Sequence, residues 1–354
     1  MKKYTFYAAF VFLFVSIQII NAQNKSTVKV DTLVSESLAK NIIGVEAKRP
    51  ITIYLPPSYS TSNKRYPVMY LLHGTGDDHL NFVDDSDNYA TIQGLMDAGI
   101  LSHRFGEMIV VTPNEKTQWG GSFYVNSSVT GNWEDFTVTE LVNYVDKNYR
   151  TIAKAESRAI VGHSMGGFGA ITLAMKHPDV FSVAYGMNSG FLSFNAELDP
   201  KNPEVKKFIQ AKTIDELLAT KSQNVIGMLM VSQAFSPNPT NPPFYADKPY
   251  KIMGNKLIPN LKAYNKWLEF DVVKMAEKYK ENLLKLRAIK FDCGDEENIK
   301  LIEINSRLFS RKLTLLGIPH QFEQYNGDHR NRLWGRKGRI YNEVLPFVFD
   351  NLEK

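Results

Sequence analysis

Five residues around position 164 have the spacing of a serine nucleophile on a tight turn. Gly162-His163-Ser164-Met165-Gly166 fits the pattern Gly-x-Ser-x-Gly, between a strand-like run that ends at Val161 and a helix-like run that follows. The glycines leave room for a strained backbone, and a helix N-terminus favours negative charge beside it. The pattern predicts Ser164 as a nucleophile, and a glycine-rich turn without chemistry is the alternative.

A serine hydroxyl is a poor nucleophile at its ordinary pKa and needs a base. In chains with this motif the expected order is serine, then a carboxylate, then histidine. Of the seven histidines, His320 opens a strand-like run and is interpreted as structural, whereas His329 lies in the loop after Gln321 to Tyr325. Loops after strands gather functional groups in α/β folds, so His329 is the predicted base. The alternative for His329 is an ordinary surface loop.

The third member of such a constellation is a carboxylate after the preceding strand. The segment after Phe291 offers four of them, and the residues alone do not choose among Asp292, Asp295, Glu296 and Glu297.

Attack on an ester creates an oxyanion that backbone N–H groups must stabilise. One donor is expected at Met165, directly after the nucleophile. The second is expected in the turn His73-Gly74-Thr75-Gly76, which follows a buried-strand pattern. We assign it to Thr75, with Gly76 as the alternative.

The elements that would position these residues alternate between strands and helices. Apolar runs typical of buried parallel strands occur at 51–55, 68–72, 108–111, 158–161, 183–187 and 288–293, and helical patterns at 136–145 and 167–176. The alternation predicts a doubly wound, mostly parallel α/β sheet. It breaks from about residue 194 to 286, which is read as helices and loops with a long amphipathic pattern from Leu261 to Leu286. This stretch is predicted to be an insertion in a single domain, 23–354.

Residues 1–22 have the layout of a secretory signal peptide. Lys2 and Lys3 precede an apolar run from Tyr7 to Ile20, and Ala22 precedes a polar segment. The run is short for a membrane anchor, so no stable membrane insertion is expected and the mature protein is predicted to be secreted or periplasmic.

Composition excludes several other classes of protein. The net charge of +5 comes from scattered residues, so no nucleic-acid partner is expected. With Cys293 as the only cysteine, no intrachain disulfide can form. The acidic residues 77–87 lack the spacing of a calcium loop, so neither a metal nor a cofactor is predicted. The oligomeric state stays open.

These motifs together resemble the esterase branch of the α/β-hydrolase fold that includes feruloyl and acetylxylan esterases, S-formylglutathione hydrolase, siderophore esterases and mycolyltransferases. The resemblance spans about residues 50–349 and is carried by 54–59, 66–74, 162–167, 291–294 and 317–320. In that family the acid commonly lies three residues beyond a glycine at the strand end. The resemblance therefore implies Glu297, although aspartate is more common at that position.

The resemblance implies a serine carboxylesterase that cleaves acetyl or feruloyl esters on plant saccharides. An acyltransferase of the same fold, an esterase for siderophores or other small esters, and a silent binding protein on this scaffold are the alternatives. Aromatic residues near the predicted site can pack on sugar or ferulate rings. Trp119, Trp133 and Trp334 are the predicted substrate-binding residues, with a core position as the alternative for each.

Overall fold

The computed structural model describes residues 25–83, 91–194 and 199–354. Its centre is an eight-stranded sheet in the order β1-β2-β4-β3-β7-β8-β11-β12. The two pairings β1–β2 and β2–β4 are antiparallel and all the others are parallel, so the mostly parallel α/β sheet is confirmed. The strands are β1 Thr27–Val34, β2 Lys48–Leu55, β3 Val68–Leu72, β4 Ile109–Pro113, β7 Arg158–His163, β8 Val183–Met187, β11 Ala288–Gly294 and β12 Gln321–Tyr325.

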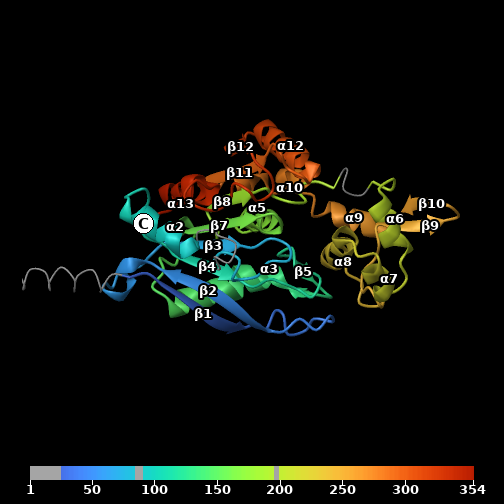
Figure 1. Cartoon of the computed structure of the whole chain (residues 1–354), viewed down its shortest axis with the longest axis horizontal. Coiled ribbons are helices and arrows are strands. Elements are labelled where there is room, and N and C mark those ends of the chain that lie inside the picture. The colour runs from blue at the N-terminus through green and yellow to red at the C-terminus, as the bar shows by residue number, and fades with distance from the viewer. Residues whose placement is uncertain (1–24, 84–90, 195–198) are drawn as a thin grey trace, which may run out of the picture.

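Helices cover both faces of this sheet (Figure 1). In β3, Val68, Tyr70 and Leu72 face one core and Met69 and Leu71 the other, as the period of two in a strand requires. The first core is closed by α4 Val142–Asn148, α5 Met165–Lys176 and α12 Lys300–Leu316, and the second by α2 Ile92–Leu101 and α13 Leu345–Asn351.

The insertion lies between β8 and β11, where the sequence predicts it. Figure 1 shows most of it grouped at one end of the molecule, beyond the strands. Two details of the prediction are wrong. The stretch contains an antiparallel hairpin, and the amphipathic pattern is divided because the carboxylate of Asp271 caps a new helix. Its elements are α6 Pro203–Gln210, α7 Ile214–Ala219, α8 Gln223–Phe235, β9 Tyr250–Met253, β10 Lys256–Pro259, α9 Leu261–Leu268, α10 Val272–Lys278 and α11 Lys280–Leu283.

Several elements escape the sequence patterns, among them β1, α2 and α12. The edge strand β1 was not predicted because half of its residues are polar and none is buried. Short elements complete the fold: η1 Pro57–Ser60, β5 Asn126–Ser127, β6 Gly131–Asn132, α3 Trp133–Asp135, η2 Phe136–Leu141, η3 Ala155–Ser157 and η4 Ile340–Val344.

The predicted signal peptide lies outside the described residues. Within them, no helix has both the length and the apolar composition that crossing a membrane requires.

Candidate active site

Ser164 occupies a strained turn between β7 and α5. Its backbone has φ 57° and ψ −116°, a conformation that residues other than glycine rarely adopt. A Cβ at Gly162 would lie 2.0 Å from the Gly166 carbonyl oxygen, and one at Gly166 would lie 2.2 Å from that of Leu72. The two glycines therefore allow the turn, and Ser164 is partly exposed among buried neighbours.

Glu297 and His329, the predicted acid and base, are in contact. The Nδ1 of His329 lies 2.8 Å from Oε2 of Glu297, and the other carboxylate oxygen accepts the Ile299 N–H at 3.0 Å. Glu297 has no exposed side-chain surface, whereas His329 retains some. A carboxylate on Nδ1 fixes the tautomer in which Nε2 is free to accept a proton.

The other three carboxylates of this turn have different partners. Asp292 is buried between the Arg339 guanidinium and the Tyr185 hydroxyl, at 2.8 and 2.7 Å. Asp295 accepts the Gly327 N–H, and Glu296 accepts the Asn326 amide. Only Glu297, among the four, contacts His329.

Two residues that the sequence analysis did not single out for a role hold His329 in place. The His163 ring packs against it with centroids 4.7 Å apart, and His163 Nε2 donates to the His329 carbonyl at 2.9 Å. Burial, together with the neighbouring His329, lowers the pKa of His163 well below its usual value, so its ring is neutral. Asn188 Nδ2 donates to the same carbonyl at 3.1 Å, and its Oδ1 accepts the Gly294 N–H. A polar residue directly after β8 is the only signal for Asn188 in the sequence.

His163 packs on the ring of His329, the predicted base, and directly precedes Ser164, the predicted nucleophile, in the chain. The hydrogen bonds among the described residues do not include one from Ser164 Oγ to His329, so proton transfer requires a small movement of the hydroxyl or the ring. In enzymes without bound substrate, the distance between nucleophile and base is often longer than a hydrogen bond.

The turn after β3 lies against Ser164. A Cβ at Gly74 would be 3.4 Å from Ser164 Cβ. The Gly76 N–H already donates to the Gly120 carbonyl at 2.9 Å, which removes Gly76 as an oxyanion donor. Among the described residues, no hydrogen bond uses the Thr75 N–H. As the first residue of α5, Met165 has an N–H without a partner inside the helix, so Thr75 and Met165 are the two candidate donors.

The buried residue Glu115, which no sequence pattern singles out, supports this turn through its backbone N–H. The Glu115 N–H donates to His73 Nε2 at 2.9 Å, so the His73 Nδ1–H donates to the Gly74 carbonyl at 2.8 Å. The Glu115 carboxyl accepts from the hydroxyls of Thr137 and Ser122, and burial raises its pKa to about 8. No charged partner bonds to it, so the carboxyl is mostly protonated at neutral pH.

The three predicted substrate-binding tryptophans have different environments. Trp133 has no exposed surface, packs with Phe136 and Leu38, and donates from Nε1 to the Thr130 carbonyl at 3.0 Å. Its prediction is therefore wrong, because Trp133 is a core residue. Trp119 is partly exposed and precedes Gly120, which contacts Thr75. Trp334 is partly exposed and packs on Phe82 with ring centroids 5.1 Å apart.

Residues 44–337 match the model of the Esterase family, which carries the description "Putative esterase". The chain belongs to this esterase family.

Two curated relatives, Esterase MT1326 and Esterase Rv1288 from strains of Mycobacterium tuberculosis, are each 35% identical over 136 residues, which is 38% of this chain. An endo-1,4-beta-xylanase/feruloyl esterase from Xylanibacter ruminicola is 28% identical over 165 residues, or 44% of this chain. The matches span about a quarter of the length of these relatives, 27% and 21% respectively.

Solved structures extend the likeness to nearly the whole chain. A ferulic acid esterase is 26% identical and superposes with a TM-score of 0.63 over 93% of this chain and all of its own. An S-formylglutathione hydrolase from Agrobacterium tumefaciens, 15% identical, has a TM-score of 0.60 over 93% of this chain and 96% of its own. The fold of this esterase is therefore that of the α/β hydrolases. Among the described residues, no group of three or more His, Cys, Asp or Glu side chains is placed to hold a metal ion.

Proposed function

We propose that this esterase is a serine carboxylic ester hydrolase in which Ser164 is the nucleophile, His329 the general base and Glu297 the acid. The observation that carries the proposal is the 2.8 Å contact between His329 Nδ1 and a fully buried Glu297. A buried carboxylate on Nδ1 orients the ring and stabilises the imidazolium that forms when His329 takes a proton.

The reaction follows from these roles. Ser164 Oγ attacks the ester carbonyl carbon while His329 Nε2 accepts the hydroxyl proton, and the N–H groups of Thr75 and Met165 stabilise the resulting oxyanion. His329 then protonates the departing alcohol oxygen, leaving an acyl-serine. A water molecule, deprotonated by His329, attacks the acyl-serine and releases the acid and Ser164.

For the substrate we propose an acetyl or hydroxycinnamoyl ester of a plant saccharide. The relatives named feruloyl and ferulic acid esterase support this class. The half-exposed ring of Trp119 supports it as well, since it lies next to the turn that carries Thr75. Trp334, beyond the base, stays in the proposal as a second aromatic contact. Secretion or export to the periplasm, through residues 1–22, belongs to the same proposal.

The insertion contributes one wall near this turn. The thioether of Met230, from α8, lies 3.6 Å from the position that a Cβ on Gly120 would occupy and 3.7 Å from that on Gly121. A Cβ at Gly121 would also meet the Met165 side chain at 2.2 Å. Both methionine side chains are buried in the first core, so they pack against the turn that holds the candidate oxyanion donors.

Labelling with a fluorophosphonate probe tests the nucleophile. Wild-type protein should be labelled at Ser164, and Ser164→Ala should lose labelling and roughly 10⁵- to 10⁶-fold of kcat on a small acetyl ester while still folding. Labelling that persists in Ser164→Ala would assign the nucleophile elsewhere.

A panel of esters tests the substrate class. The kcat/KM should be higher for feruloyl- or acetyl-saccharides than for long-chain aliphatic esters. The reverse order would exclude the saccharide assignment and leave the serine chemistry intact.

A further inference from the structure

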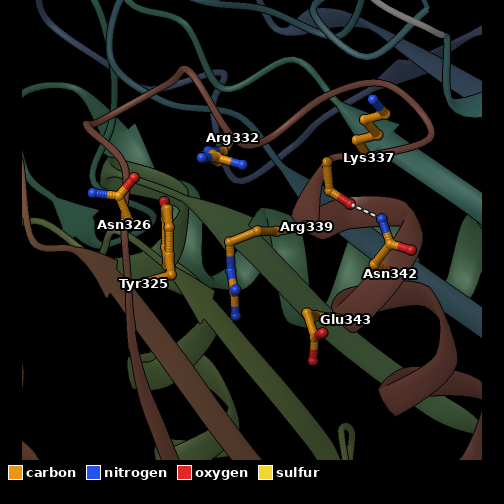
Figure 2. A pocket seen from close by; sticks show the side chains of 8 residues that line it. Tyr325, Asn326, Arg332, Lys337, Arg339, Asn342 and Glu343 are labelled. Carbon is orange, nitrogen blue, oxygen red and sulfur yellow. Dashed lines mark hydrogen bonds between the residues drawn. The ribbon is translucent and has the colours of Figure 1, made fainter.

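A polar cavity of about 280 Å³ opens beside the loop that carries His329, and nothing in the ester chemistry uses it. Figure 2 shows Tyr325 and Asn326 on one side of it, Asn342 and Glu343 on another, and Arg332 and Lys337 near one end. The lining residues are Tyr325, Asn326, Arg332, Lys337, Gly338, Arg339, Asn342 and Glu343.

The negative charges around this cavity are already paired. Arg339 bonds to Asp292 at 2.8 Å and to Glu323 at 2.7 Å, and its guanidinium lies 4.3 Å from the centre of the Tyr325 ring. The Glu343 carboxylate pairs with Lys290 at 3.0 Å. These contacts fix the floor of the cavity and leave Arg339 without a free charge for a ligand.

Two cations of the lining have no such partner. Arg332 and Lys337 are exposed, and no ion pair of the described residues includes either of them. Arg336, which lies between them in the sequence, is exposed as well and takes part in no ion pair with another described residue. The nearest acids along the loop are engaged locally: Asp328 accepts the N–H groups of Arg330 and Asn331. The floor holds three carboxylates, Asp292, Glu323 and Glu343, against two cations, Arg339 and Lys290. With Arg332 and Lys337 this group of side chains carries one positive charge in excess.

The cavity and the candidate active site lie at the same edge of the sheet and share hydrogen bonds of Asn188. Tyr325 ends β12, and the nucleophile follows β7, with β8 and β11 between them in the sheet. Tyr325 and Ser164 both lie at the carboxyl ends of their strands. These strands are three spacings apart in the sheet, so the two residues are separated by roughly 14 Å. The Tyr325 hydroxyl accepts from Asn188 Nδ2 at 2.7 Å, and that amide also donates to the His329 carbonyl.

We propose that this cavity is a subsite for an anionic saccharide unit that bears a carboxylate or a sulfate. This unit lies several sugar units along the substrate from the ester that Ser164 attacks. Arg332 and Lys337 bind the anion, and the partly exposed Asn342 lies beside them for hydroxyl groups. The inference rests on the proposed function, since it assigns the remote part of the same substrate. It narrows that substrate to esters carried by acidic rather than neutral saccharide chains.

Calorimetric binding to the Ser164→Ala protein tests the subsite without turnover. The ligands are unesterified tetragalacturonate, a sulfated galactan tetrasaccharide and neutral xylotetraose, each at low salt and in about 0.5 M NaCl. At least one anionic ligand should bind about tenfold more tightly than xylotetraose at low salt and lose that advantage at high salt. The stronger of the two anionic ligands identifies carboxylate or sulfate as the preferred group.

A charge-matched pair of variants locates the site. Arg332→Ala with Lys337→Ala should weaken binding of the anionic ligand about tenfold, and Arg332→Glu with Lys337→Glu should abolish it. Lys29→Ala with Lys48→Ala removes the same charge from exposed positions on β1 and β2, at the opposite edge of the sheet, and should retain binding.

Equal binding of all three ligands, or an equal loss in both charge-matched variants, would overturn the subsite. Failure of the proposed function has a different signature, because it appears as fluorophosphonate labelling away from Ser164 whatever the binding data show.

Discussion

Two fully buried glutamates lie on opposite sides of Ser164, and the site uses them differently. Glu297 contacts an imidazole nitrogen of His329 and one backbone N–H. Glu115 contacts two hydroxyls, those of Thr137 and Ser122, and its pKa is raised to about 8 by burial. Residue type and burial are the same, so the partners decide what each carboxyl does.

The difference shows what a buried carboxyl needs in order to serve as a catalytic acid partner. A hydroxyl satisfies a carboxyl oxygen but cannot take up the proton charge that appears during the reaction, whereas an imidazole can. The backbone N–H of Glu115, and not its carboxyl, donates to His73, whose ring donates to the Gly74 carbonyl in the turn of the candidate oxyanion donor. The Glu297 carboxyl is placed to stabilise charge on His329, whereas the Glu115 carboxyl joins Ser122 and Thr137 in the protein interior.

The largest effect is expected from a substitution of Glu297, the charged one of the two buried glutamates. Glu297→Gln keeps the size of the side chain but removes the charge that stabilises the His329 imidazolium, so kcat should fall by about 10³- to 10⁴-fold. Steady-state kinetics on a small acetyl ester measures this loss.

Three isosteric variants are the controls for that loss. Asp295→Asn and Glu296→Gln, from the same turn, should cost far less, because these carboxylates bond to Gly327 and Asn326 rather than to the base. Glu115→Gln should retain most of the activity. Equal and small losses in all four variants would remove Glu297 from the mechanism.

A smaller effect is expected on the free energy of unfolding, whose dependence on pH distinguishes Glu115 from Glu297. Its folded pKa is raised from 4.5 to about 8, so the folded protein binds a proton that the unfolded chain has released between these values. The contribution to stability is fully present below pH 4.5 and is lost as pH rises through about 8. The total loss is on the order of a few kcal/mol.

Urea unfolding of wild type and Glu115→Gln at pH 6 and pH 9 measures this contribution. Glutamine mimics the protonated carboxyl, so the variant should gain stability relative to wild type as the pH rises, while other titrations cancel in the difference. A difference that stays constant between pH 6 and pH 9 would mean that Glu115 is ionised in the folded protein throughout.

The strained turn that carries Ser164 was predictable from the sequence because its signal is local. A serine in the left-handed region between a strand and a helix needs Gly162 and Gly166, and both are visible in the sequence. The acid was not, because four carboxylates within six residues differ only in how the chain turns after β11. The family resemblance supplied the choice of Glu297, and the contact with His329 now gives it a physical reason.

Burial is what the sequence could not assign. Trp133 and Trp119 stand in the same aromatic segment, yet one is in the core and the other is partly exposed. The burial of Glu115, in the loop after β4, has no signal in the sequence, because its two hydroxyl partners lie 7 and 22 residues away. Such pairings depend on the packing of the whole sheet and not on a local pattern.

The smallest effects on kcat are expected from residues that support one of the two glutamates each. Asn188 supports the side of the site that holds Glu297 and His329. Its amide joins the His329 carbonyl, the Tyr325 hydroxyl and the Gly294 N–H, and its φ of 41° tolerates glycine. Asn188→Gly should lower kcat about tenfold with KM nearly unchanged, because the base is misplaced while the substrate contacts remain. Tyr124→Phe removes one bond to the His73 carbonyl on the Glu115 side, and it should cost less than about threefold in kcat. If KM rises with kcat unchanged in Asn188→Gly, Asn188 contributes to substrate binding, and His329 is held by Glu297 and His163 without it.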